Sequence, residues 1–139
     1  MRRLFIMRKD LKMSPGKLAA QVGHCAEAYW TNLIKEGSRP NNSDKIIIEV
    51  DNAIYDNYLC DKFVKTICEA RNKTHLLKAK TAAEELGLKE NVDFGLIYNA
   101  CFTELTPEEE NGTTLTGMWF KPLTDDIAHS ISKKYQLYR

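Results

Sequence analysis

A strand signal and a helix signal follow one another in the stretch RLFIMRKDLKMSPGKLAAQVGHCAEA, residues 3–28. The first six residues are a short, largely apolar run, which predicts a central strand over Arg3–Arg8. Ser14 suits the N-cap of a helix, and Pro15 suits its first position, where a missing N–H removes no hydrogen bond. We expect this helix to extend to Glu36. A strand that leads directly into a long helix indicates an α/β protein.

The rest of the chain alternates further strand and helix signals. The expected strands are Lys45–Val50, Asp93–Phe102 and Thr113–Leu123, and the expected helices are Tyr55–Asn72, His75–Leu88 and a last one that begins after Thr124. A length of 139 residues corresponds to one domain, and no repeat, linker or low-complexity segment divides it. We therefore predict a single α/β domain with a mixed four-stranded sheet and helices on both faces.

Positive charge is concentrated near the N-terminus although the net charge is only +1. The basic residues of this segment are Arg2, Arg3, Arg8, Lys9, Lys12 and Lys17, and only Asp10 opposes them. Such a cluster can bind a polyanion, although a solvated N-terminus would show the same pattern.

The four cysteines, at positions 25, 60, 68 and 101, form no C-x-x-C pair, which argues against a zinc site. No apolar run reaches membrane length. We expect a cytoplasmic protein with reduced thiols, without metal or cofactor and without a membrane partner.

On a helical wheel the first helix separates into an apolar face and a polar stripe. The apolar face comprises Leu18, Val22, Cys25, Ala26, Tyr29 and Leu33, and the polar stripe comprises Lys17, Gln21 and His24. Lys17 lies in the first turn beside free backbone N–H groups, which makes a natural anion site. Cys25 is interpreted as a small buried hydrophobe rather than a nucleophile, and neighbouring helix positions diverge too far for a Cys25–His24 pair.

The run R-x-DLKM-x-x-GK-x-AAQ-x-GH, from Arg8 to His24, resembles the N-terminal signature of the type 2 peptidyl-tRNA hydrolases. The second signature of that family reads roughly L-I-x-D-A-G-x-T-Q-I-x-P-G-T. Similar segments here are LIYNACFTEL, NGTT, FKPL and a terminal YQLY, so the resemblance covers nearly the whole chain. Much of residues 53–75 looks like an insertion, which we expect to be helical.

The resemblance implies a catalytic set of Lys17, Gln21, Asn99 and Thr103, and substrate contacts at Arg8, Lys12, His24 and Thr113. Three of these four residues, Lys17, Gln21 and Thr103, are of the type that the family has at the matching position. At the fourth position the family has Asp, and this chain has Asn99. The family's Gly two residues later is Cys101, and Phe102 replaces a small or basic residue. The implied partner is tRNA, and a homodimer is implied as well.

The implied reaction is hydrolysis of the ester between a peptide and the 3′ ribose of tRNA. It needs a positioned water, a proton acceptor and a cation for the developing oxyanion. Lys17 suits the role of the cation, and Thr103 suits that of holding the water. Gln21 suits the role of orienting Lys17 or the substrate. Phosphates would be held by the N-terminal basic cluster and by Arg71, Lys73 and Lys78, although the last three also fit a solvated helix face.

An amide cannot act as a general base, so Asn99 leads to a second hypothesis. In that hypothesis the chain is a weakened family member that binds RNA or a protein. A third is an unrelated small α/β enzyme with Cys25 or Cys101 as its nucleophile.

Overall fold

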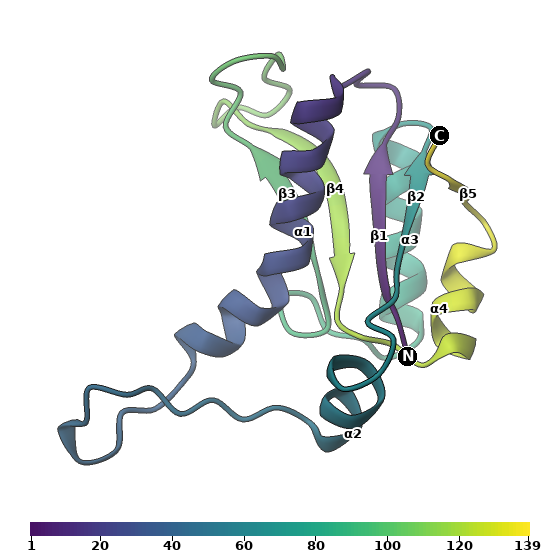
Figure 1. Ribbon diagram of the computed structural model, residues 1–139. Helices are drawn as coiled ribbons and strands as arrows, with labels where there is room; N and C mark the ends of the chain where they lie inside the picture. Colours follow the sequence, from purple (N-terminus) through teal and green to yellow (C-terminus); the bar gives the residue numbers. More distant parts are fainter.

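Strand β1 lies at the centre of a five-stranded mixed sheet, whose order is β3-β4-β1-β2-β5 (Figure 1). The strands of this computed structural model, which describes all 139 residues, are β1 (Arg3–Arg8), β2 (Lys65–Ala70), β3 (Phe94–Asn99), β4 (Thr114–Phe120) and β5 (Gln136–Leu137). β1 pairs with β2 in parallel, and the remaining neighbours are antiparallel. The single α/β domain and the mixed sheet are confirmed. The predicted number of four strands is wrong, because β2 and β5 were not predicted and Lys45–Val50 is not a strand.

Helices cover both faces of the sheet. The helices are α1 (Pro15–Lys35), the short α2 (Asn52–Ile54), α3 (Lys73–Glu85) and α4 (Asp125–Ser132). α1 packs on one face against β1, β3 and β4, whereas α3 and α4 pack on the other face. The helix predicted from Pro15 is confirmed, with Ser14 as its N-cap.

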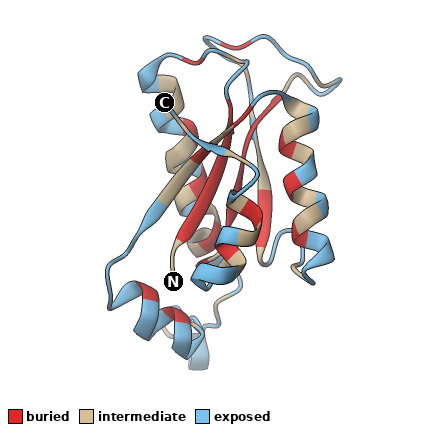
Figure 2. Cartoon of the chain, turned by 90° about the vertical axis from the view of Figure 1, so that its right-hand side faces the viewer, coloured by how far each residue is buried: buried red, intermediate tan, exposed pale blue.

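Alternation along β1 builds two cores, which explains why the first strand is completely buried (Figure 2). Leu4 and Ile6 point toward α3 and α4 and belong to one apolar cluster. Phe5 and Met7 point toward α1 and join a second cluster that includes Cys25 and Tyr29. The apolar face predicted for the first helix is therefore confirmed.

The helix predicted over Tyr55–Asn72 is wrong. A π-helical segment, Tyr55–Leu59, follows α2, and the chain then becomes strand β2. β2 pairs over its whole length with β1, from Arg3 opposite Lys65 to Arg8 opposite Ala70. The apolar spacing fits a helix equally well, and only the partner strand decides between the two. The insertion itself stays a prediction. Within residues 53–75, the helical parts are residues 53–59 and the first residues of α3, from Lys73.

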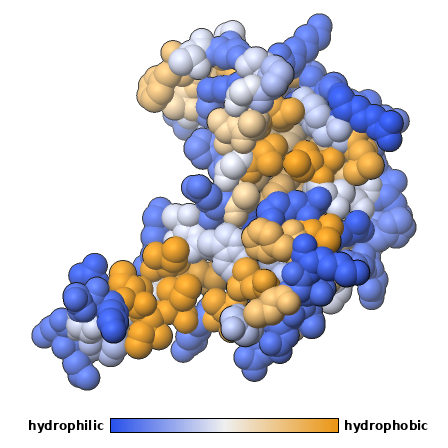
Figure 3. Space-filling model, in the orientation of Figure 1, coloured by the Kyte–Doolittle hydropathy of each residue, from blue (hydrophilic) through white to orange (hydrophobic).

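The segment of residues 37–50 leaves the body of the protein as an extended arm (Figure 1). The strand predicted over Lys45–Val50 is wrong, because the arm meets no sheet edge and forms only one bridge, between Ser38 and Ile47. Ile46, Ile47 and Ile48 are exposed, and Figure 3 shows hydrophobic surface along this part of the chain. None of the helices is long and apolar enough to span a bilayer.

Candidate functional site

Three segments meet at the sheet edge where β1 ends: the first turn of α1, the loop after β3 and the turn before β4 (Figure 1). There the Lys17 Nζ lies 3.5 Å from the Thr103 Oγ1. These residues are 86 positions apart, and both belong to the predicted catalytic set. The fold therefore places a cation beside a hydroxyl at the start of a helix.

Gln21 lies one helical turn beyond Lys17 but is buried, with only 1% of its surface exposed. The Thr116 hydroxyl, on β4, donates a hydrogen bond of 2.8 Å to the Gln21 Oε1. The polar stripe of the wheel is thus not wholly solvated, because α1 presents Gln21 to the sheet. The bond fixes the Gln21 amide and leaves its nitrogen free of partners within the chain.

Asn99 ends β3, and its side chain turns back on its own loop. The Asn99 Oδ1 accepts a hydrogen bond of 2.8 Å from the backbone N–H of Cys101. Cys101 has a φ of 60°, in the left-handed region that costs a non-glycine residue about 1–2 kcal/mol. Its Sγ lies 3.4 Å from both the Asn99 carbonyl oxygen and the Thr114 Oγ1. Asn99 makes no hydrogen bond to Lys17 or Gln21, so here it shapes the loop.

A carboxylate that the sequence reasoning missed lies at the start of α1. The backbone N–H and the hydroxyl of Ser14 donate hydrogen bonds of 2.7 and 2.5 Å to the two Glu104 carboxylate oxygens. These bonds, with a smaller contribution from the Lys17 charge, hold the pKa of the Glu104 carboxyl below its ordinary value. No local pattern signals this contact, because the two residues are 90 positions apart.

Arg8 is the least accessible of the predicted substrate contacts, because only 3% of it is exposed. Its guanidinium donates to the Asp10 carboxylate at 2.8 and 3.1 Å, to Glu108 at 2.5 and 3.2 Å, and to the Leu115 carbonyl at 3.1 Å. Burial alone would lower the pKa of Arg8, but the hydrogen bonds to both carboxylates raise it. Arg8 therefore ties the end of β1 to the turn before β4, and a phosphate contact would require these bonds to break.

The other three predicted substrate contacts form no hydrogen bond to Lys17 or Thr103. Lys12 is exposed, with a left-handed φ of 50° in the loop before α1. His24 is exposed on α1. The Thr113 hydroxyl donates a hydrogen bond of 2.7 Å to the Asn111 Oδ1 in the turn before β4. Their roles in substrate binding stay predictions.

The N-terminal basic cluster is not a continuous surface patch, which corrects that interpretation. Arg3 is fully buried and donates to the carbonyl oxygens of Cys25, Ala26 and Phe120. The Lys9 Nζ contacts the Arg139 carbonyl and lies 4.0 Å from Glu69, and Arg2 lies 4.0 Å from Asp125. Of the cluster, Lys12 and Lys17 remain without an acidic partner.

A second group of basic residues stands where β2 ends, at the same edge of the sheet as Lys17. Arg71 and Lys78 are exposed and form no ion pair, and they line a shallow groove with Lys134. Lys73 pairs with Glu109. Parallel pairing of β1 and β2 explains the placement, because the carboxyl ends of parallel strands meet at one edge.

The thiols do not form a nucleophilic site. Cys25 is completely buried, and burial raises the pKa of its thiol to about 12. A thiol of this kind carries almost no thiolate at neutral pH. Cys101 lies in the loop beside Asn99 without a histidine among its bonded partners. The hypothesis of a Cys25 nucleophile is wrong, because its thiol is buried in the α1 core.

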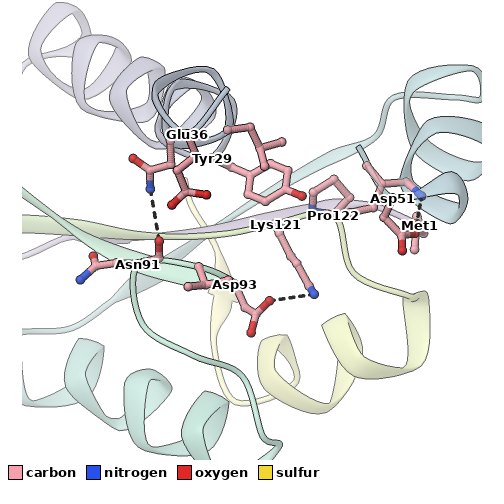
Figure 4. A pocket seen from close by; sticks show the side chains of 12 residues that line it. Met1, Tyr29, Glu36, Asp51, Asn91, Asp93, Lys121 and Pro122 are labelled. Atoms are coloured by element: carbon pink, nitrogen blue, oxygen red, sulfur yellow. Dashed lines mark hydrogen bonds and ion pairs between the residues drawn. The ribbon is translucent and has the colours of Figure 1, made fainter. Parts of the chain in front are cut away.

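A cavity of about 330 Å³ lies at the opposite edge of the sheet (Figure 4). Tyr29 from the second half of α1 and Glu36, the C-cap of that helix, line it together with Asn91, Asp93 and Lys121. An ion pair of 2.8 Å joins the Lys121 Nζ to Asp93 across it. None of the predicted site residues reaches this cavity.

Comparisons with known proteins place the whole chain in one family. The family model described as Peptidyl-tRNA hydrolase PTH2 matches residues 1–138. The chain belongs to the peptidyl-tRNA hydrolase PTH2 family. Two similar proteins, both named peptidyl-tRNA hydrolase, come from Thermococcus onnurineus (strain NA1), at 26% identity, and Thermococcus sibiricus (strain DSM 12597 / MM 739), at 27%. Each match spans 136 residues, which is 98% of this chain and 96% of the other protein.

Proposed function

We propose that this protein hydrolyses the ester bond between peptide and tRNA in peptidyl-tRNA and releases free tRNA. Membership of the PTH2 family supports this reaction class. The observation that carries the proposal for this chain is the approach of Lys17 to Thr103, at 3.5 Å. Two residues predicted to act together lie together, although they come from distant parts of the chain.

In the proposed mechanism, the ester carbonyl lies against the first turn of α1. The Lys17 ammonium stabilises the negative charge that develops on the carbonyl oxygen when water attacks. The Thr103 hydroxyl, already beside Lys17, holds the attacking water. As the water oxygen bonds to the carbonyl carbon, the bond to the 3′ oxygen of the ribose breaks, and the water proton ends on that leaving oxygen. Gln21, fixed by Thr116, offers its free amide nitrogen to the substrate. An ester has a good leaving alcohol, so these groups need not include a strong nucleophile.

The tRNA would be held mainly through its phosphates, because few base-reading groups are needed for a substrate of any sequence. Lys12, Arg71 and Lys78 are the exposed cations at this edge that support the assignment. Phe102, 91% exposed beside Thr103, offers an aromatic ring on which a terminal base can stack. This mode of binding predicts that the KM rises steeply with salt.

One assay tests the proposal: wild type, Lys17→Ala and Asn99→Asp are compared on the same N-blocked aminoacyl-tRNA. We expect turnover in the wild type and a loss of about 10²- to 10³-fold in Lys17→Ala. Lys35→Ala, at the far end of α1, is the matched control and should keep the wild-type rate. No release of free tRNA by wild type at high enzyme concentration would refute the function.

A second function is favoured by one observation, the amide at position 99. If the family's Asp is an essential base, its absence costs about 10²- to 10⁴-fold, and the chain would act as an RNA- or protein-binding module. Turnover only in Asn99→Asp would support this alternative, whereas equal rates in wild type and Asn99→Asp would contradict it.

The proposed setting is the cytoplasm, and the proposed assembly is a homodimer. The exposed isoleucines of the arm, Ile46 and Ile47, are the apolar surface that supports self-association. Sedimentation equilibrium of wild type and of Ile47→Lys tests the assembly. A monomeric wild type at micromolar concentration would contradict it.

A further inference from the structure

We propose that Glu104 supplies the carboxylate that the site lacks at Asn99, and that it acts as a positioning residue for Lys17 and Thr103. This inference rests on the proposed hydrolase function. It gives the chain a way to perform the reaction with an amide at position 99.

The first step is the location of the carboxylate. Both Glu104 oxygens are bonded to Ser14, the N-cap of α1, at 2.5 and 2.7 Å. The Ser14 Oγ in turn accepts a hydrogen bond of 3.4 Å from the backbone N–H of Lys17. The carboxylate therefore connects through Ser14 to the first turn of the helix that carries the site lysine.

The second step is the connection to Thr103. Glu104 follows Thr103 directly, so fixing the carboxylate on Ser14 also fixes the loop that presents the threonine hydroxyl. The Lys17–Thr103 contact of 3.5 Å is the visible result. The loop needs such an anchor, because Phe102, Thr103 and Glu104 are all exposed and carry little packing of their own.

The third step is charge. A cation that stabilises an oxyanion gains from a fixed carboxylate nearby, which holds it in position. Asn99 cannot supply that charge, and its Oδ1 already accepts from Cys101. In the L-I-x-D-A-G-x-T-Q-I pattern the acid stands four residues before the Thr and a Gln follows it. Here Asn99 and Glu104 hold those two positions, so the single negative charge of the segment has moved from one side of the threonine to the other.

The experiment compares wild type, Glu104→Gln, Asn99→Asp and the double variant Asn99→Asp/Glu104→Gln on N-blocked aminoacyl-tRNA. Glu104→Gln keeps the shape of the side chain and removes its charge. We expect its kcat to fall about 10- to 100-fold with little change in KM, as for a misplaced catalytic group. The double variant, which restores the family arrangement, should recover to within about threefold of the wild-type kcat.

The rescue separates a charge role from a merely structural one. If Glu104 only latches the loop, the double variant stays as slow as Glu104→Gln, and the proposal is overturned. A wild-type kcat in Glu104→Gln overturns it as well. Glu110→Gln, a matched loss of one exposed acid in the turn before β4, should leave kcat unchanged. Thermal unfolding of each variant checks that the fold is retained.

The same assay keeps this inference distinct from the function on which it rests. Turnover in wild type that disappears in Lys17→Ala, together with an unaffected Glu104→Gln, would leave the hydrolase standing and remove only the role of Glu104. Absence of turnover in wild type would overturn both.

Discussion

Arg3 and Arg8 stand at opposite ends of strand β1, and both are almost completely buried, but their surroundings differ. Arg3 donates only to neutral backbone carbonyls, those of Cys25 and Ala26 on α1 and of Phe120 on β4. It also stacks on an aromatic ring, with its guanidinium carbon 4.9 Å from the Phe5 centroid. Arg8 is held by two carboxylates instead.

The difference shows how the two edges of one sheet are built. At the Arg3 end a cation without an acidic partner joins α1 to the sheet, and burial lowers the pKa of Arg3 to about 10, which still leaves it charged at neutral pH. At the Arg8 end, charge pairs join the strand to the loops that surround Lys17. Acidification should therefore weaken the charge pairs at this end, as it weakens the Asp93–Lys121 pair at the opposite end. The cavity beside Lys121 lies at the Arg3 end, whereas Lys17 and Thr103 lie at the Arg8 end.

The largest effect is expected at Arg3. Arg3→Met removes the hydrogen bonds to three carbonyls and should lower the free energy of unfolding by about 3–5 kcal/mol. Urea denaturation measures the loss. Arg39→Met, on the exposed arm, is the control and should stay within about 0.5 kcal/mol of wild type. A stable Arg3→Met protein would show that Phe5 and Tyr29 pack well enough without the cation.

A smaller loss of unfolding free energy is expected on substitution of Arg8, because water can solvate its two carboxylate partners once the arginine is removed. The side chains of Asp10 and Glu108 are 35% and 38% exposed. Arg8→Met should therefore cost about 1–3 kcal/mol, and it should also lower kcat by loosening the turn before β4. Urea denaturation gives the first quantity, and the peptidyl ester assay gives the second. An unchanged kcat would separate Arg8 from the site and weaken the contrast between the two ends.

Part of the pH dependence of stability should come from the Arg8 end. Hydrogen bonds from Arg8 hold the pKa of Glu108 below its ordinary value of 4.5. A lowered folded-state pKa stabilises the protein above the unfolded-state value, and this stability is lost as pH falls through the folded-state pKa. The difference in unfolding free energy between wild type and Glu108→Gln should therefore shrink below about pH 4.5. Denaturation series at pH 7, 5, 4 and 3 test this. A constant difference would contradict it.

The smallest effect is expected at the cavity. Lys121→Ala removes the ion pair with Asp93, whose members are 31% and 16% exposed, and should cost about 1 kcal/mol or less. Its kcat should equal that of wild type, because Lys121 lies at the far edge from Lys17. A large loss of kcat would move the site to the Arg3 end and refute the comparison between the two edges.

Features that depend on neighbours in sequence were predicted well. Ser14 and Pro15 mark the start of α1, and the apolar spacing of that helix gives its buried face. The resemblance placed Lys17 and Thr103 in one site, and the fold brings their side chains within 3.5 Å. Features that depend on distant partners were missed. KTICEA becomes a strand because β1 lies beside it. KIIIEV is richer in β-branched residues, but it does not become a strand, because no strand lies beside it.

Local residue order was enough to establish the first strand, the first helix and the chemical types that gather near them. Only the tertiary structure decided which charges reach solvent and which groups share the site. Arg3, Arg8 and Lys17 look alike in the sequence, yet two are buried and one faces Thr103. Burial and pairing are set by segments about 100 residues away, such as the turn with Glu108 and the loop with Glu104. A local pattern contains no information about those neighbours, because they come into contact only when the sheet has formed.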